Sequence, residues 1–393
     1  MLSWLSLMLD KFFSMFSHDI GIDLGTSNTL VYVRGKGIVI REPSVVAMHK
    51  KTKKVVAIGT EAKKMVGKTP ASIITIRPLR GGVISDFDAT TAMISHYIQG
   101  VHEVGNVLPV RFAKPKVVIG IPSSVTEVER RAVWESALNS GARAAYLIEE
   151  PMAAAIGEGI SVFAPTGVMV VDIGGGTTEI AIISLGGIVI SKSLKVAGDD
   201  MDAAIIHYVR LRHGLLIGEK TAEELKIAIG SAYESKKSRP KAGRPLDEKV
   251  EKITLTEEKI MEEVGVSLEE EKKGDKMAVI RGRDIETGLP KSLRVSEVEI
   301  REGLAPVLSQ ILQGITDVLE EAPPEMTSDI LEHGILLTGG GSMLPGLNHL
   351  IVERTKIPVI SSDDPLTSVA RGTGKVLEDE TLLQRVKVIG GLR

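Results

Sequence analysis

The first candidate for chemistry is a turn of small and polar residues, Asp23-Leu24-Gly25-Thr26-Ser27-Asn28-Thr29. Gly25 lets the backbone pass close to a ligand, so successive N–H groups and the side chains of Thr26 and Asn28 can hydrogen-bond phosphate oxygens. The carboxylate of Asp23 suits a Mg²⁺ ion held through water, because Mg²⁺ keeps much of its hydration shell. Taken alone the turn is a weak signal, since many β-turns contain the same residue types.

A second turn of similar composition follows about 150 residues later, with the sequence Asp172-Ile173-Gly174-Gly175-Gly176-Thr177-Thr178-Glu179. Three adjacent glycines lose much backbone entropy when they become ordered, so their presence needs a structural reason. If this turn faces the first across a cleft, the two can clamp the β- and γ-phosphates of a nucleotide, and Asp23 and Asp172 can share one hydrated Mg²⁺. The paired turns therefore predict a phosphate-binding site.

A third glycine cluster, Gly339-Gly340-Gly341, follows an apolar run and precedes residues that suit a helix. Its backbone could lie against a flat base and a sugar, and a helix N-terminus would favour a phosphate nearby. The alternative is a tight connection from strand to helix. Other nucleotide motifs match poorly: the run Gly67-Lys68-Thr69 has Ala62 where a P-loop needs its first glycine, and no G-x-G-x-x-G is present.

These turns must be positioned by strands and helices, and short β-rich runs alternate with helical ones from Asp19 onward, as in an α/β fold. We predict strands over Asp19–Leu24, Thr29–Arg34, Gly37–Arg41, Lys116–Ile121, Ala145–Ile148, Val168–Asp172, Glu179–Leu185 and Gly187–Val196. We predict helices over Asp88–Val104, Thr126–Asn139, Met201–His213 and Ala222–Ser231. An apolar strand ending in Asp, a Gly/Thr turn and a returning strand occur twice, which indicates an internal duplication of one α/β domain.

The composition excludes several kinds of site. The 393 residues include no cysteine, which rules out disulfides, thiolate metal sites and cysteine nucleophiles, and the eight histidines show no HxxxH or HExxH spacing. A net charge of −3 argues against a general nucleic-acid binder, because phosphate neutralisation needs clustered excess Lys and Arg. In the segment 234–277, 23 of 44 residues are charged, so we expect a solvated helix, a charged loop or disorder.

The first seventeen residues form a separate segment. Wound as a helix, they place Ser3, Ser6, Asp10 and Ser14 opposite a broad apolar arc, with Leu7 the exception. The arc includes Leu2, Trp4, Leu5, Leu9, Phe12, Phe13 and Phe16. The segment is too short to span a bilayer and lacks the basic start and the cleavage site of a signal peptide. Such a helix lies in a membrane interface, or it docks on the protein's own core or on another subunit.

The three turns, in this order and spacing, resemble those of the ATPase superfamily of actin, sugar kinases and the seventy-kilodalton heat-shock chaperones. Within it, the chain closely resembles the MreB family of bacterial actin homologues from about residue 18 to residue 380. The segments that carry the resemblance are DIGIDLGTSN at 19–28, EPSVV at 42–46, IEEPMAAAIG at 148–157, DIGGGTTE at 172–179, GDDMD at 198–202 and LTGGGSML at 337–344. The charged segment and the N-terminal extension are expanded relative to the usual family pattern.

The resemblance implies an α/β, actin-like ATPase fold, in which two duplicated RNase H-like lobes surround a nucleotide cleft and carry smaller inserted subdomains. We expect a membrane-binding helix at 1–17, lobe I at 18–164 with a small subdomain at about 47–79, and lobe II at 165–365. Lobe II would hold a small subdomain at about 201–295, with the charged insert 234–277, and residues 366–393 would return to lobe I.

The resemblance also implies residues that bind ATP with Mg²⁺. Those of the two phosphate turns are Gly25, Thr26, Ser27, Asn28, Gly174, Gly175, Gly176, Thr177 and Thr178, with Asp23 and Asp172 holding Mg²⁺ through water. Gly198 and Asp199 are two further nucleotide-binding residues. Those at the adenosine are Gly340, Gly341, Ser342 and Met343, with Glu223 and Lys226 closing over the ribose and the base. Glu223 and Lys226 share a helix face at i, i+3 spacing, which a plain surface ion pair would also explain.

Glu150 is the candidate residue for ATP hydrolysis. It precedes Pro151, which suits the first turn of a helix, so its carboxylate would lie at a helix start. There it could orient or deprotonate the water that attacks the γ-phosphate. The alternative is a carboxylate that only complements the helix dipole, and Glu149 is the rival residue. The family resemblance favours Glu150.

Members of this family stack head to tail into protofilaments that pair antiparallel and lie on the membrane, and one repeated contact that does not close suffices for such a filament. The resemblance therefore implies self-association, contact with inner-membrane lipids and contact with the membrane-bound cell-wall elongation machinery. A loop with Val107, Leu108, Val110 and Phe112 resembles the family's membrane-inserting loop, although Pro109 and Arg111 could equally mark an ordinary packed connection. Beside this second apolar loop, we interpret residues 1–17 as a membrane anchor.

We therefore expect a slow ATPase that forms membrane-associated filaments on the cytoplasmic side of the cell membrane and directs cell shape and wall elongation in rod-shaped bacteria. A chaperone ATPase is disfavoured, because the chain ends at Arg393 with no room for a substrate domain. A small-molecule kinase would show ATP turnover stimulated by a sugar or carboxylate acceptor. A pure scaffold would release phosphate unchanged after Glu150→Ala. The residues leave the choice between ATP and GTP open.

Overall fold

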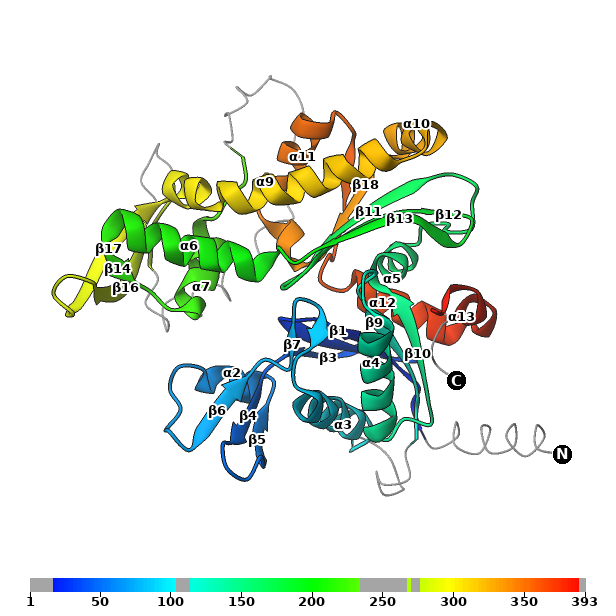
Figure 1. Cartoon of the computed structure of the whole chain (residues 1–393), viewed down its shortest axis with the longest axis horizontal. Coiled ribbons are helices and arrows are strands. Elements are labelled where there is room, and N and C mark those ends of the chain that lie inside the picture. The colour runs from blue at the N-terminus through cyan, green and yellow to red at the C-terminus, as the bar shows by residue number, and fades with distance from the viewer. Residues whose placement is uncertain (1–16, 104–113, 234–266, 270–275, 389–393) are drawn as a thin grey trace, which may run out of the picture. The chain divides into compact units, whose positions relative to one another are not determined.

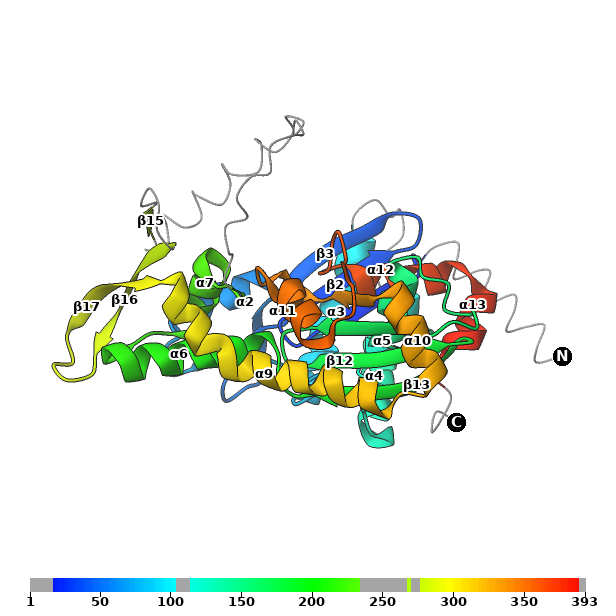
Figure 2. The ribbon, with the colours of Figure 1, turned by 90° about the horizontal axis from the view of Figure 1, so that it is seen from above.

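The computed structural model describes residues 17–103, 114–233, 267–269 and 276–388. The chain divides into two compact units, which we describe separately. The first unit contains Met1–Gly198, Gln313–Ser342 and Ile357–Arg393, and the second contains Asp199–Leu312 and Met343–Lys356. Figures 1 and 2 show the helices and strands from two directions.

Two five-stranded sheets of the first unit share one strand order. The first sheet has the order β3-β2-β1-β9-β10, and the second has the order β13-β12-β11-β18-β19. In each sheet the first three strands along the chain pair antiparallel, and the other two add in parallel. The shared order confirms the predicted internal duplication of one α/β domain.

The predicted strands agree with the observed ones to within two residues. The first sheet consists of β1 (Ile20–Leu24), β2 (Asn28–Val33), β3 (Gly37–Pro43), β9 (Lys116–Ile121) and β10 (Ala144–Glu149). The second consists of β11 (Val168–Ile173), β12 (Thr178–Ser184), β13 (Gly187–Leu194), β18 (Ile335–Thr338) and β19 (Val359–Ser361). Strands β1, β9 and β11 are buried on both faces, which accounts for their nearly continuous runs of apolar residues.

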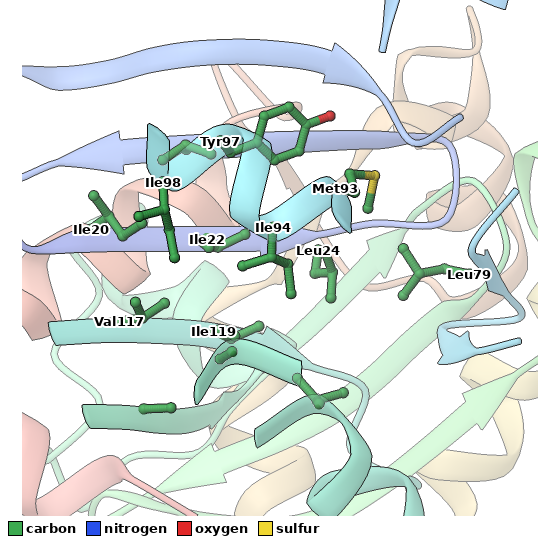
Figure 3. Packing of buried hydrophobic residues seen from close by; sticks show 14 of the residues in the cluster. Ile20, Ile22, Leu24, Leu79, Met93, Ile94, Tyr97, Ile98, Val117 and Ile119 are labelled. Carbon is green, nitrogen blue, oxygen red and sulfur yellow. The ribbon is translucent and has the colours of Figure 1, made fainter. Parts of the chain in front are cut away.

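Helix α3 (Phe87–Glu103) packs its apolar side onto the first sheet. Figure 3 shows Ile94 and Ile98 of this helix against Ile20 and Ile22 of β1, and all four side chains are buried in one cluster. Apolar residues of α3 recur at helical spacing, so they fall on one side of the helix and meet the sheet. This packing fixes β1, the strand that carries Asp23.

Helix α4 (Glu127–Asn139) begins directly after its N-cap residue, Thr126, one residue later than predicted. The Thr126 hydroxyl accepts a hydrogen bond from the Glu129 N–H, and the Glu129 carboxylate accepts one from the Thr126 N–H. This reciprocal capping box satisfies two backbone donors that the helix itself cannot pair. The helix therefore starts at a defined point after β9.

Helices α5 (Glu150–Gly157) and α12 (Ser368–Glu378) pack together between the two sheets of the first unit. Their backbones touch: a Cβ atom on Gly157 would lie 1.9 Å from the Ser368 carbonyl oxygen, and one on Gly372 would lie 1.8 Å from the Ala153 carbonyl oxygen. Apolar residues of β9 and β11 join α5 and α12 in one buried cluster. The glycines thus allow the close crossing through which the two sheets share a core.

The first unit also carries a small subdomain after β3. It consists of the sheet β5-β4-β6, with β4 (Val46–His49), β5 (Val55–Ile58) and β6 (Ile73–Ile76), and of helix α2 (Thr60–Met65). Val45, Ala47 and Ala62 form its own buried cluster. The hairpin of β7 (Leu79–Arg80) and β8 (Val83–Ile84) then leads to α3. None of these short strands was predicted from the sequence, although a small subdomain was expected at about 47–79.

The second unit combines helices with a four-stranded sheet. Its elements are α6 (Gly198–His213), α7 (Glu219–Ile229), the first part of α9 (Glu297–Glu321), α11 (Leu347–Thr355), β14 (Leu215–Leu216), β15 (Ser267–Glu269), β16 (Met277–Asp284) and β17 (Pro290–Ser296). The predicted starts of α6 and α7 are each three residues too late. The first unit is completed by α10 (Pro324–His333) and α13 (Glu380–Val386).

Two predicted membrane-binding segments lie outside the described residues. They are residues 1–16 of the amphipathic helix and the loop with Val107 and Leu108. Most of the charged segment 234–277 lies outside them as well. Among the helices that the structure describes, none is both long enough and apolar enough to cross a membrane.

Candidate functional site

The two predicted phosphate turns lie in direct contact within the first unit. The first turn joins β1 to β2, and the second joins β11 to β12. A Cβ atom on Gly175 would lie 2.1 Å from Ser27 Oγ, and one on Gly176 would lie 2.6 Å from Thr26 Oγ1. No side chain fits at either glycine without displacing the first turn. The contact between the two turns therefore explains why glycines occupy these positions.

Replacing Gly176 with alanine should therefore push the two turns apart. Displacing the buried Thr26 side chain costs on the order of 1–3 kcal/mol, so we expect ATP affinity to fall about tenfold or more. Gly174→Ala is the matched control, because its Cβ atom would meet only the Thr177 carbonyl oxygen, at 3.2 Å. Titration with a fluorescent ATP analogue measures both variants, and equal affinities for the two would contradict the assigned contact.

Ser44 supports the first turn from the end of β3. Its hydroxyl donates a hydrogen bond to the Gly25 carbonyl oxygen at 2.6 Å and lies 2.8 Å from the Thr29 hydroxyl. Its backbone N–H donates to the Ser27 carbonyl oxygen at 2.9 Å. Ser44 is fully buried, so these bonds hold the turn in one conformation. Ser44 lies in the EPSVV segment, but this supporting role was not predicted from the sequence.

Asp23 and Asp172 lie beside the turns. Asp23 pairs with Gly120 in the register of β1 and β9, and Asp172 pairs with Thr338 in the register of β11 and β18. Burial raises the pKa of Asp23 to about 7. Burial, and after it the negative charges of Asp23 and Glu179, raises the pKa of Asp172 well above its ordinary value. The negative charge of Asp23 therefore acts on Asp172, and ionising both carboxyl groups favours a nearby cation.

These carboxylates fit a hydrated magnesium ion. They offer only oxygen donors, which Mg²⁺ prefers, and Mg²⁺ commonly keeps several waters and takes further oxygens from a phosphate. Among the described residues, no group of three or more His, Asp and Glu side chains is arranged to hold a metal ion directly. A water-mediated contact through Asp23 and Asp172 needs no such group.

Asp23→Asn should have opposite effects on the empty and the loaded protein. The folded-state pKa of Asp23 is raised to about 7, so its proton stabilises the fold below about pH 4, and that contribution is lost as the pH rises through 7. At pH 8 we therefore expect the neutral amide of Asp23→Asn to raise the melting temperature of the nucleotide-free protein. We expect the same change to weaken Mg²⁺-dependent ATP binding about tenfold or more.

Differential scanning fluorimetry with and without Mg²⁺ and ATP measures both effects. Asp284→Asn is the control, because the Lys291 side chain lowers the pKa of Asp284 by hydrogen bonding, so its neutralisation should lower the melting temperature at pH 8 instead. Wild-type ATP binding should also weaken as the pH falls from 8 to 6. An Asp23→Asn protein that gains as much thermal stability from Mg²⁺ and ATP as the wild type would rule out the assigned role.

Glu150 is the first residue of α5, as predicted, with proline next in the helix. A Cβ atom on Gly120 would lie 3.5 Å from Glu150 Cγ, and Gly120 is the β9 neighbour of Asp23, so Glu150 lies near the end of β1 that carries the first turn. Burial, followed by the charges of Glu179, Asp23 and Asp172, raises the pKa of Glu150 well above its ordinary value. The carboxyl group of Glu150 is thus close to the proposed phosphate site.

Glu179 is a buried member of this group that sequence reasoning missed. It pairs with Asp172 in the register of β11 and β12 and is 1% exposed. Its carboxylate accepts hydrogen bonds from the Ser123 N–H at 3.0 Å, from the Ser123 hydroxyl at 2.7 Å and from the Ser193 hydroxyl. Ser123 follows β9, so Glu179 links the two sheets. The signal was that Glu179 is the single charged residue of strand β12, since a buried carboxylate needs hydrogen-bond donors.

The third glycine cluster lies against the end of β11. A Cβ atom on Gly339, which has φ of 84°, would lie 2.3 Å from Asp172 Oδ1. One on Gly341 would lie 2.4 Å from Ile173 Cγ2. The cluster therefore belongs to the same part of the first unit as the second phosphate turn.

The predicted continuation of this cluster into a helix is only partly correct. Gly340–Met343, which includes Ser342, forms a short 3₁₀ helix, η2. Helix α11 begins only at Leu347, because Gly346 has left-handed backbone angles that interrupt the helical path. The glycines are thus separated from the α-helix N-terminus that was expected to favour a phosphate.

Hydrogen bonds of Gly198 and Thr178 stabilise the second turn. The Gly198 N–H donates a hydrogen bond to the Gly174 carbonyl oxygen at 3.1 Å. Thr178 is fully buried, and its hydroxyl donates to the Val196 carbonyl oxygen at 2.7 Å. The Thr178 hydroxyl proton is therefore committed to the backbone, which makes Thr177 the better candidate of the two threonines for a phosphate.

The other predicted nucleotide residues, Asp199, Glu223, Lys226 and Met343, belong to the second unit. There the Lys226 ammonium lies 2.9 Å from the Asp202 carboxylate, and both side chains are mostly buried. Burial raises the pKa of Asp202 to about 6, against the opposing effect of Lys226. A role of these residues in nucleotide binding stays a prediction.

The chain matches one protein family over nearly its whole length. The family model described as MreB/Mbl protein matches residues 17–245 and 249–385. The chain belongs to the MreB/Mbl family. The cell shape-determining protein MreB of Escherichia coli is 47% identical over 375 residues, which cover 94% of this chain and 96% of that protein. The cell shape-determining protein Mbl of Bacillus subtilis is 43% identical over 374 residues, which cover 95% and 100%.

Solved structures agree with membership of the MreB/Mbl family. MreB5 of Spiroplasma citri bound to ADP superposes with a TM-score of 0.78 at 34% identity, covering 94% of this chain and 98% of that chain, and the complex with AMPPNP gives the same values. A MamK double helical filament superposes with a TM-score of 0.68 at 22% identity, which shows the fold alone. The predicted α/β, actin-like ATPase fold is confirmed.

Proposed function

We propose that this MreB/Mbl protein binds ATP with Mg²⁺, polymerises in the ATP-bound state and hydrolyses ATP slowly. The observation that carries the proposal is the direct contact between the two phosphate turns, with Asp23 and Asp172 beside them. The structures of MreB5 with ADP and AMPPNP support a nucleotide as the ligand. The names of the MreB and Mbl relatives support a role in determining cell shape, which we extend to wall elongation in rod-shaped bacteria.

The two turns would bind the phosphates mainly through backbone N–H groups. Bonds from such groups to a charged oxygen are stronger than bonds between neutral partners, and glycine lets the backbone approach. Bound Mg²⁺ would neutralise phosphate charge, with its waters held by Asp23 and Asp172. Glu150 would orient or deprotonate the attacking water. Gly340 and Gly341 would contribute backbone to the adenosine site.

We further propose the division into lobe I at 18–164 and lobe II at 165–365, with residues 366–393 returning to lobe I. Residues 1–17 and the loop with Val107 and Leu108 would attach the protein to inner-membrane lipids. The protein would then lie peripherally on the cytoplasmic face of the cell membrane, near the cell-wall elongation machinery. Head-to-tail protofilaments, paired antiparallel, would form its polymer.

Sedimentation of the purified full-length protein tests the proposed function. At micromolar concentration we expect the protein to pellet with ATP or AMPPNP and to stay in the supernatant without nucleotide. Removal of residues 1–17 should abolish flotation with lipid vesicles and leave ATP-dependent pelleting in place. Failure to pellet with either nucleotide would refute the proposal, and ATP turnover stimulated by a sugar or carboxylate acceptor would favour a small-molecule kinase.

A further inference from the structure

The small subdomain of the first unit is strongly basic. Between residues 47 and 79 there are eight Lys and Arg residues and one Glu, a formal charge of +7 in a chain of net charge −3. Four of these residues form what we call the lysine turn between β4 and β5, namely Lys50, Lys51, Lys53 and Lys54. All four are exposed, and none forms an ion pair within the part of the chain that the structure describes.

Backbone hydrogen bonds hold the lysine turn in one conformation. The Lys53 N–H donates to the His49 carbonyl oxygen at 2.9 Å, and the His49 N–H donates to the Lys54 carbonyl oxygen at 2.8 Å. Lys53 has φ of 57°, a left-handed angle that residues with a side chain rarely adopt. Four like charges on one ordered turn repel one another, so a negatively charged partner surface would lower their free energy.

The same unit carries a complementary negative surface at the junction of α9 and α10. We call this surface the acidic end, and it consists of Glu320, Glu321, Glu325 and Glu332, all exposed and, among the described residues, without an ion pair. Glu325 and Glu332 are seven residues apart on α10, which places them on one side of the helix. The surface therefore presents several carboxylates together.

Another exposed run of acidic residues in this unit, at 378–380, already has partners within the molecule. Glu378 accepts a hydrogen bond from the Tyr32 hydroxyl, Asp379 caps α13, and Glu380 pairs with Lys116 at 2.7 Å. The acidic end has no such partners in the described chain. It is therefore the better match for the lysine turn.

The lysine turn and the acidic end cannot meet within one molecule. They belong to the same unit, yet Figure 1 shows the β4–β5 hairpin and α10 far from each other, at the lower left and the upper right. Each surface also has an exposed apolar side chain next to it, Val56 at 52% and Leu331 at 59%, which a contact between proteins would bury. This combination favours a protein partner over a lipid surface.

We infer that the lysine turn of one copy docks on the acidic end of the next copy in a head-to-tail contact. Two different surfaces that meet in this way leave one of each free at the ends, so the assembly grows as a filament. The inference rests on the proposed polymerisation and names the surfaces that carry it. Because the charges are exposed, the contact should weaken as salt is added.

Charge reversal of each surface tests the inference in the full-length protein. One variant replaces Lys50, Lys51, Lys53 and Lys54 with Glu, and the other replaces Glu320, Glu321, Glu325 and Glu332 with Lys. Alone, each should raise the critical concentration for ATP-dependent pelleting about tenfold or more, because like charges then face each other. An equal mixture should pellet again as an alternating copolymer. A chain with both reversals, which keeps the wild-type net charge of −3, should pellet by itself.

The outcomes separate this inference from the proposed function. Wild-type protein that does not pellet with ATP would overturn both. Wild-type pelleting together with unchanged pelleting of either single-surface variant would overturn the inference alone. So would variants that fail to pellet and are restored neither by mixing nor by the double reversal, while thermal melting and ATP binding show them folded. Loss of flotation with vesicles of anionic phospholipid, without loss of pelleting, would assign the lysine turn to lipid instead.

Discussion

Glu150→Gln is expected to slow ATP hydrolysis about a hundredfold or more while ATP-dependent polymerisation continues. A positioned general base contributes about 10²- to 10⁴-fold to such reactions, and glutamine keeps the shape of the side chain without its basic oxygen. Glu150 is the first residue of α5, and the charges of Asp23 and Asp172 contribute to its raised pKa, so it lies near the two carboxylates that we propose hold Mg²⁺. Phosphate release at saturating ATP measures the effect, and pelleting in parallel shows whether filaments still form.

Glu149→Gln is the matched control for this substitution. Glu149 immediately precedes α5 as its N-cap residue, although its side chain makes no capping hydrogen bond. Burial raises the pKa of Glu149, and the positive charge of Arg130 opposes that rise. All the causes that act on the pKa of Glu150 raise it. We expect hydrolysis by Glu149→Gln to stay within a few fold of the wild type. The reverse ranking of the two variants would transfer the hydrolytic role to Glu149.

Gly372→Ala is expected to destabilise the fold by about 3 kcal/mol or more. The new Cβ atom would lie 1.8 Å from the Ala153 carbonyl oxygen and 2.5 Å from its carbon, so two helix backbones would have to separate. Overpacking against a backbone that cannot rotate away ranks among the costly point substitutions. Because α5 and α12 share one core with both sheets, the loss should appear in the unfolding of the whole first unit.

Gly100→Ala provides the control for a glycine inside a helix. Gly100 lies in α3, and apart from its neighbours along the helix no atom lies within 4 Å of a Cβ atom built there. Alanine has a higher helix propensity than glycine, by about 1 kcal/mol, so this variant should be neutral or slightly stabilised. Urea unfolding followed by circular dichroism compares the two. Equal stability of Gly372→Ala and Gly100→Ala would show that the crossing of α5 and α12 is not tightly packed.

The sequence by itself determined the local features of the site. Strands with both faces buried, such as β1 and β11, are rich in apolar residues, and a turn with Gly and Thr residues follows each one. The position of Glu150 at a helix start depends on residues close in the chain, and each copy of the duplicated strand–turn–strand unit lies within one short segment. Periodicity and spacing capture such features, because neighbouring residues share one backbone path.

Only the tertiary structure decided which distant residues support those turns. Gly175 packs on Ser27, Ser44 holds Gly25, and Ser123 binds Glu179 across two sheets, yet each pair is far apart in the sequence. The same holds for the α5–α12 crossing, where a glycine is required by a backbone more than two hundred residues away. These contacts depend on how the two sheets pack, and packing is a property of atoms brought together in space. The spacing of residues along one strand or helix therefore does not predict how the two sheets pack.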